Sequence, residues 1–130
     1  MRILHIIDSI GPGGPARSLL ALMEHGQLPG VRISHVVVAL RKPAYMPLVF
    51  AMRRLDAGMH LAPAQPVTAQ EIESADVVLV HFWNTPEIGK FLAAEWPASR
   101  LVHWTKIMGS TAPQLFDPDL LGQAATAERK

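Results

Sequence analysis

A chain of 130 residues with 12 Lys and Arg against 11 Asp and Glu has a net charge of only +1, which argues against a dedicated nucleic-acid-binding protein. Cysteine is absent, which excludes disulfide scaffolds, cysteine-bound zinc and thiol catalysis. Hydrophobic residues make up 49% of the chain, enough to bury the core of one domain spanning residues 1–130. None of the histidines forms an i, i+4 pair, so we expect no metal site.

The first half of the chain alternates between strand and helix patterns. Ile3–Ile10 is a short apolar run that predicts a buried strand, and glycines and a proline end it. Pro15 suits a first helical position, and Gly26 marks the end of that helix. A second strand is predicted over residues 33–40, a second helix from Pro47 to Gly58, and a short third strand over residues 59–62. The expected buried face of the second helix carries Leu48, Ala51, Met52 and Leu55.

The second half continues the alternation. Thr68 and Glu71 form a capping-box pattern, which predicts a brief helix over residues 69–75. A fourth strand is predicted over residues 76–83, followed by a helix that starts at Thr85-Pro86 and buries Ile88, Phe91 and Leu92. The fifth predicted strand covers residues 100–105, and Asp117-Pro118 suggests one more helix start.

This order predicts an α/β fold, with a Rossmann-like parallel sheet, the first strand in its centre and helices on both faces. Ligands bind such sheets beyond the carboxyl ends of the strands. We therefore expect residues 11–15, 83–86 and 106–113 to meet at one edge of the sheet and to carry the chemistry.

The glycines after the first strand are the first candidate site. Gly13 and Gly14 would let a ligand approach the backbone at a helix N-terminus, where a phosphate or a sugar hydroxyl fits; the alternative is a plain tight turn. The loop matches neither a dinucleotide fingerprint, because Ala16 stands at the third glycine position, nor a P-loop. Arg41-Lys42 stand where a dinucleotide-binding domain has its ribose-binding acid.

Two further groups lie at the ends of the fourth and fifth predicted strands. His81, Trp83 and Asn84 suit a sugar-contacting surface; the alternative is that His81 is a hydrogen-bonded core histidine and Trp83 is core packing. His103 and Lys106 lie at the end of the fifth predicted strand, where Lys106 can meet a phosphate or carboxylate; the alternative is a solvated lysine.

Several of these segments, taken together, resemble a known family. They are Arg2–Ile7, Gly13–Leu20, Ala75–His81, and Arg100–Lys106 followed by Gly109 and Ala112-Pro113. In this order they are similar to the N-terminal domain of family 4 glycosyltransferases of the GT-B fold. Two positions depart from the family pattern: Ala16 replaces a frequent Glu, and Lys106 stands where a His is common.

The resemblance implies retaining, metal-independent transfer of a sugar from a nucleotide-sugar substrate, with no other cofactor, to a glycan or lipid-linked acceptor. Together with the residue patterns above, it makes Lys106 and His103 the catalytic candidates. It also makes these residues the donor- or acceptor-binding candidates: Gly13, Gly14, His81, Trp83 and Asn84. Because GT-B enzymes have a second, donor-binding domain, we expect this chain to be an inactive N-terminal fragment that self-associates or pairs with the missing domain. The alternative is a non-catalytic binding or scaffold domain; the glycine loop counts against a nucleotide-dependent oxidoreductase.

No run of 18 apolar residues and no cleavable leader is present, so we expect a cytoplasmic protein. Phe50, Arg53 and Arg54 on the second predicted helix leave open a peripheral position at the inner membrane surface, against the alternative of a solvated face.

Overall fold

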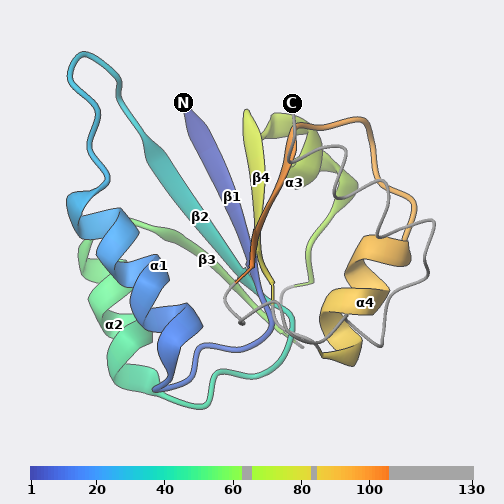
Figure 1. Cartoon of the computed structure of the whole chain (residues 1–130), viewed down its shortest axis with the longest axis horizontal. Coiled ribbons are helices and arrows are strands. Elements are labelled where there is room, and N and C mark those ends of the chain that lie inside the picture. The colour runs from blue at the N-terminus through green and yellow to red at the C-terminus, as the bar shows by residue number, and fades with distance from the viewer. Residues whose placement is uncertain (63–65, 83–84, 106–130) are drawn as a thin grey trace.

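The computed structural model describes residues 1–62, 66–82 and 85–105 (Figure 1). Its elements in chain order are β1 (Arg2–Ile7), α1 (Gly14–His25), β2 (Ser34–Ala39), α2 (Met46–Arg54), β3 (Gly58–Leu61), α3 (Ala69–Ser74), β4 (Val77–Phe82), α4 (Pro86–Ala93) and β5 (Leu101–Thr105). The predicted alternation of strands and helices is therefore confirmed over the described part of the chain. The predicted helix start at Asp117-Pro118 lies outside it.

The five strands form one parallel sheet in the order β3-β2-β1-β4-β5. This is a Rossmann-like arrangement, and β1 lies in its centre as predicted. The chain adds β2 and β3 on one side of β1 and then returns to add β4 and β5 on the other. Such a reversal leaves a crevice beyond the carboxyl ends of β1 and β4, because the connections leave these two strands in opposite directions.

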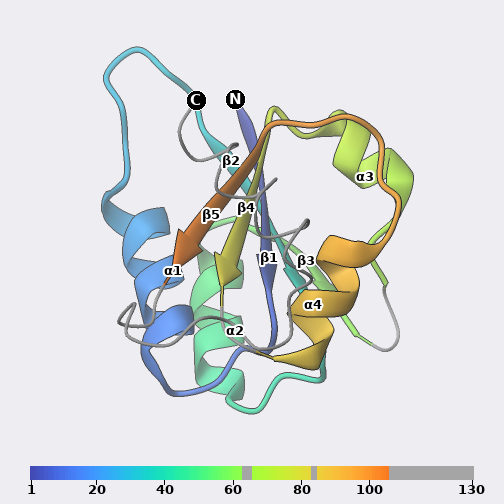
Figure 2. The same ribbon diagram turned by 45° about the vertical axis from the view of Figure 1, so that its right-hand side comes forward.

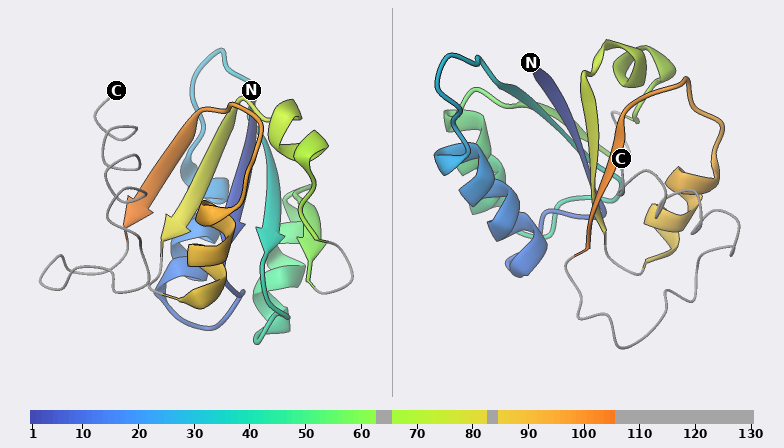
Figure 3. Two further views of the ribbon diagram at one scale, coloured as in Figure 1. Left: turned by 90° about the vertical axis from the view of Figure 1, so that its right-hand side faces the viewer. Right: turned by 45° about the horizontal axis from the view of Figure 1, so that its top comes forward.

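Helices cover both faces of the sheet (Figures 1 and 3). One core lies under α1 and α2, where Leu19 and Met52 pack on Ile7 and Val37. The other lies under α3 and α4, and it buries side chains from β1, β2 and β4 that point the other way: Leu4, Ile6, Val36, Val38, Val78 and Val80. Because both of their faces are buried, the strands are almost continuous apolar runs in the sequence. No helix in the described ranges is long and apolar enough to cross a bilayer.

The ends of α1 and the buried face of α4 follow the sequence predictions. Pro15 occupies the first turn of α1, and the Gly26 N–H donates to Leu22 O at 2.7 Å where the helix ends. The buried residues of α4 are Ile88, Phe91 and Leu92.

Helix α2 differs from its prediction. It ends at Arg54 rather than near Gly58, and Asp56 takes a left-handed conformation (φ 60°) in the turn that follows. Leu55 is consequently a helix cap with 42% of its surface exposed, and Val49 is buried together with Met52. Gly58 instead begins β3, where the position of an added Cβ would lie 3.4 Å from Val36.

The capping box at α3 is half formed. Thr68 Oγ1 accepts a hydrogen bond from Glu71 N at 3.3 Å, as the pattern predicts. The Glu71 carboxylate instead meets His60 Nε2 at 2.6 Å, and so ties α3 to β3.

Candidate functional site

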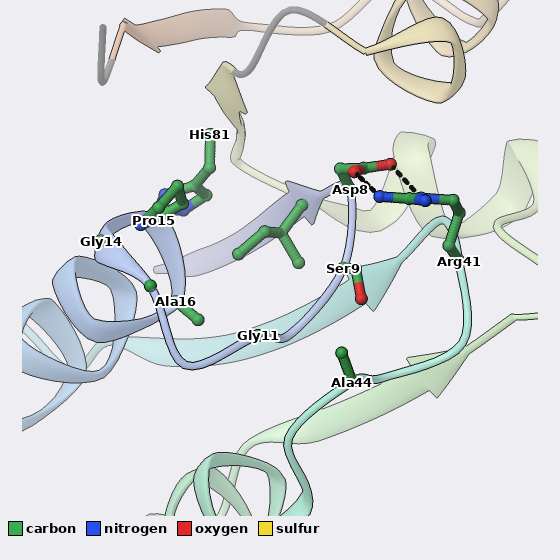
Figure 4. A pocket seen from close by; sticks show the side chains of 11 residues that line it. Asp8, Ser9, Gly11, Gly14, Pro15, Ala16, Arg41, Ala44 and His81 are labelled. Atoms are coloured by element: carbon green, nitrogen blue, oxygen red, sulfur yellow. Dashed lines mark hydrogen bonds and ion pairs between the residues drawn. The ribbon is translucent and has the colours of Figure 1, made fainter.

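A cavity of about 360 Å³ opens at the carboxyl end of β1 (Figure 4). It lies where the sheet reversal predicts a ligand crevice. Four segments contribute to it: the loop after β1, the start of α1, the loop after β2 and the end of β4. Its lining residues are Ile7, Asp8, Ser9, Gly11, Gly13, Gly14, Pro15, Ala16, Arg41, Ala44 and His81. We call it the switch-point pocket.

Ile10 joins two of the loops that line this pocket. Its side chain is fully buried although it lies beyond the end of β1. Its carbonyl oxygen accepts the N–H groups of Ala44 and Tyr45 at 3.0 and 2.9 Å, which ties the loop after β1 to the loop after β2. The pocket therefore has a hydrogen-bonded framework rather than two independent loops.

The N-terminus of α1 forms one wall. Gly13 is the N-cap, with an extended backbone (φ −85°, ψ −170°), and it has no side chain to accept the first N–H groups of the helix. No described atom lies within 4 Å of the position that a Cβ would take at Gly13 or Gly14, and neither has a positive φ. The described fold therefore does not itself require glycine at these two positions. A ligand that approached the backbone closely at this positive helix end would require glycine there.

Asp8 and Arg41 form an ion pair on another side of the pocket (Figure 4). Arg41 Nε donates to Asp8 Oδ1 at 2.9 Å, and Arg41 Nη2 donates to Asp8 Oδ2 at 2.6 Å. The Asp8 side chain is 9% exposed and that of Arg41 is 55% exposed. Hydrogen bonding to Asp8 raises the pKa of the Arg41 guanidinium. Among the sequence predictions, Arg41 appeared only as the residue in place of a ribose-binding acid, and Asp8 was not a candidate. The position of Asp8 directly after an apolar run was the available signal.

His81 reaches the pocket from the end of β4 and belongs to a row of three histidines. His81 Nε2 lies 2.9 Å from His5 Nδ1, and His5 Nε2 lies 2.8 Å from His35 Nδ1. His5 and His81 have no exposed surface, and partial burial lowers the pKa of His35. The Trp104 ring lies 5.7 Å from that of His81, centroid to centroid. His5 and His35 were not among the predicted site residues, although each is a histidine inside an apolar run that predicts a buried strand.

The structure brings together only some of the predicted site residues. Gly13, Gly14 and His81 line one pocket, as expected. His103 is level with Val80 in the β4–β5 register, so it lies on the α3/α4 face, opposite to His81. The other three candidates, Trp83, Asn84 and Lys106, lie outside the described residues, as do most of the loops over 83–86 and 106–113.

A second hollow of about 380 Å³ lies on the α3/α4 face, beside Phe91 and Trp96. Two of its charged residues, Glu87 and Lys90, approach each other to 4.0 Å on the same helix, and Trp96 Nε1 donates to Phe91 O at 2.7 Å. These polar groups are occupied within the fold, so the switch-point pocket is the better candidate site.

Comparison with protein-family models, with curated proteins and with solved structures finds no match to this chain. The site and the fold therefore carry the functional argument: a Rossmann-like parallel α/β domain with a pocket at the topological switch point, walled by a helix N-terminus, an ion pair and a buried histidine.

Proposed function

We propose that this chain is the acceptor-side domain of a GT-B-type glycosyltransferase, and that the switch-point pocket binds a sugar or the phosphate-linked end of a sugar substrate. The observation that carries the proposal is the meeting of Gly13, Gly14 and His81 in one cavity at the carboxyl edge of the sheet. The order of the glycosyltransferase-like motifs in the sequence supports the same function.

The chemistry of the pocket fits a ligand rich in hydroxyl groups. The Asp8–Arg41 pair places one negative and one positive group at the wall, so their formal charges cancel. The N–H groups at the start of α1, which have no side-chain cap, favour an oxygen acceptor. An imidazole can accept a hydrogen bond from a hydroxyl or donate one to it. A volume of about 360 Å³ lies at the lower end of the range for small-molecule sites, roughly 300–1,000 Å³.

A dinucleotide cofactor fits less well. Arg41 stands at the end of β2, where such domains place a ribose-binding acid, or an arginine that accommodates a 2′-phosphate. Both nitrogens of Arg41 that face Asp8 are committed to its carboxylate. Binding a 2′-phosphate there would compete with this bidentate pair.

The binding part of the proposal is tested by titrating the ¹⁵N-labelled chain with UDP-glucose, GDP-mannose, free hexoses and NADPH, while following the amide signals of Gly13, Gly14 and His81. A nucleotide sugar or hexose should shift these signals saturably. Gly14→Val should abolish the shifts. A Cβ at position 14 meets no described atom within 4 Å, so the fold tolerates the valine, but the valine side chain takes up space in the pocket that the ligand needs. Ala21→Val, on the exposed side of α1, is the matched control.

Two results would overturn the proposal: no response at these three residues to any sugar ligand, or an unchanged response in Gly14→Val. A response to NADPH alone would favour an oxidoreductase domain. Nucleotide release from a bound nucleotide sugar, measured on the intact gene product, separates an enzyme from a non-catalytic binding domain.

A further inference from the structure

The three histidines form a diagonal row that leads across the sheet to the pocket. His35 is level with Ile3 in the β1–β2 register, and His5 is level with Leu79 of β4. His81 lies two residues beyond Leu79, and the next residue ends the strand. The row therefore starts near the amino end of β2, crosses β1 and ends in the switch-point pocket, always on the α1/α2 face of the sheet.

The hydrogen bonds of this row are coupled through His5. A neutral imidazole has one N–H donor and one acceptor nitrogen. Since both ring nitrogens of His5 lie within hydrogen-bond distance of a neighbouring histidine, a neutral His5 that donates to His81 must accept from His35. If it accepts from His81, it must instead donate to His35. The two bonds thus run in the same direction along the row, and reversing one reverses the other.

We propose that His35 and His5 are positioning residues that set the tautomer of His81, so that the row works as a proton relay between the pocket and the amino end of β2. His81 Nε2 forms the hydrogen bond to His5, so Nδ1 of His81 is the ring nitrogen whose protonation the relay controls. The catalytic meaning of the relay rests on the proposed function, whereas its existence does not.

Proton movement along the row balances atom by atom. A proton that arrives at His81 Nδ1 allows the Nε2 proton of His81 to pass to His5 Nδ1. The Nε2 proton of His5 then passes to His35 Nδ1. His81 and His5 end neutral with their tautomers exchanged, and the added proton stays on the His35 ring, whose Nε2 is buried. His35 is the suitable end of the row because it is only partly buried, while His5 and His81 have no exposed surface.

A metal site is a poorer explanation of this cluster. The ring nitrogens meet in successive pairs at 2.9 and 2.8 Å instead of converging on one point, and no group of three or more metal-ligating side chains is found among the described residues. The His5 and His35 ring centroids lie 5.1 Å apart with 25° between the ring planes, so the two rings meet edge to edge through this hydrogen bond.

The relay is tested by NMR on the full chain with ¹⁵N-labelled histidine. In the wild type we expect nitrogen–nitrogen couplings across both hydrogen bonds. His35→Phe keeps a ring at position 35 but removes its nitrogen atoms, so the ring-nitrogen signals of His81 should shift towards a different tautomer population. His35→Gln supplies an amide that can donate or accept, and it should restore the wild-type signals. His25→Phe, at the exposed end of α1, is the matched control and should leave His81 unchanged.

Absence of either coupling in the wild type would overturn the relay, and this measurement needs no variant to fold. Unchanged His81 nitrogens in a folded His35→Phe chain would also overturn it, because a merely structural His35 would have no effect two rings away. Couplings present without any sugar binding would leave the relay standing and refute the proposed function. Sugar binding without couplings would refute the relay and leave the proposed function standing.

Discussion

Removing one partner of the Asp8–Arg41 pair should have very different effects depending on which partner is removed. Asp8 is 9% exposed in its side chain, and Arg41 is 55% exposed. Arg41→Met therefore leaves a carboxylate in a nearly buried position, without the two hydrogen bonds that it accepts from the guanidinium. Asp8→Asn leaves a guanidinium that water already reaches.

The magnitudes follow from this asymmetry. Breaking a buried ion pair by removing one partner costs about 3 kcal/mol or more, and this applies to Arg41→Met because the remaining charge is the buried one. Asp8→Asn should cost about 1 kcal/mol, because the amide oxygen can still accept one bond and the arginine is solvated. The double variant should be more stable than Arg41→Met alone, since a neutral amide costs less to bury than a carboxylate.

Urea unfolding measures these differences, because urea does not screen the ion pair as a salt would. With a urea m-value of about 1.5 kcal/mol per M, a loss of 3 kcal/mol lowers the unfolding midpoint by about 2 M. Arg53→Met on the exposed surface of α2 makes the same exchange away from the pocket, and should change stability by less than about 0.5 kcal/mol. Equal destabilisation by Asp8→Asn and Arg41→Met would contradict this asymmetry, as would a double variant that is no more stable than Arg41→Met.

Three other outcomes are expected. Gly13→Ala and Gly14→Ala should change the melting temperature little, because no described atom lies near the added methyl group, while sugar binding weakens; a large stability loss in either would contradict the open space seen there. Gly26→Ala should destabilise the chain by about 1 kcal/mol or more, because an added Cβ would lie too close to the Leu22 carbonyl oxygen; thermal unfolding equal to wild type would disprove this. Stability should fall as pH drops below about 6.5, because burial lowers the pKa of His35 and the unfolded chain then binds more protons, by up to about 1.4 kcal/mol per pH unit for each proton not bound in the fold. Urea midpoints between pH 7.5 and 5 measure this dependence, and a flat profile through pH 6 would refute it.

The sequence alone determined the alternation of strands and helices and the central place of β1. These features are local or follow from general rules: apolar runs of strand length, prolines at helix starts, and the right-handed crossovers of parallel strands. The same rules placed Gly13, Gly14 and His81 at the carboxyl edge, because the two glycines lie at the start of the helix after β1 and His81 lies one residue before the end of β4. The length of α2 was the weaker prediction, because the left-handed turn at Asp56 carries no apolar periodicity.

Only the tertiary structure decided which polar groups meet. Asp8 and Arg41 lie 33 residues apart in the sequence, and His5 and His81 lie 76 apart. Their contacts depend on the register between neighbouring strands, which no single segment contains. One residue of register also decides that Trp104, and not His103, lies beside His81, because successive side chains point to opposite faces of the sheet.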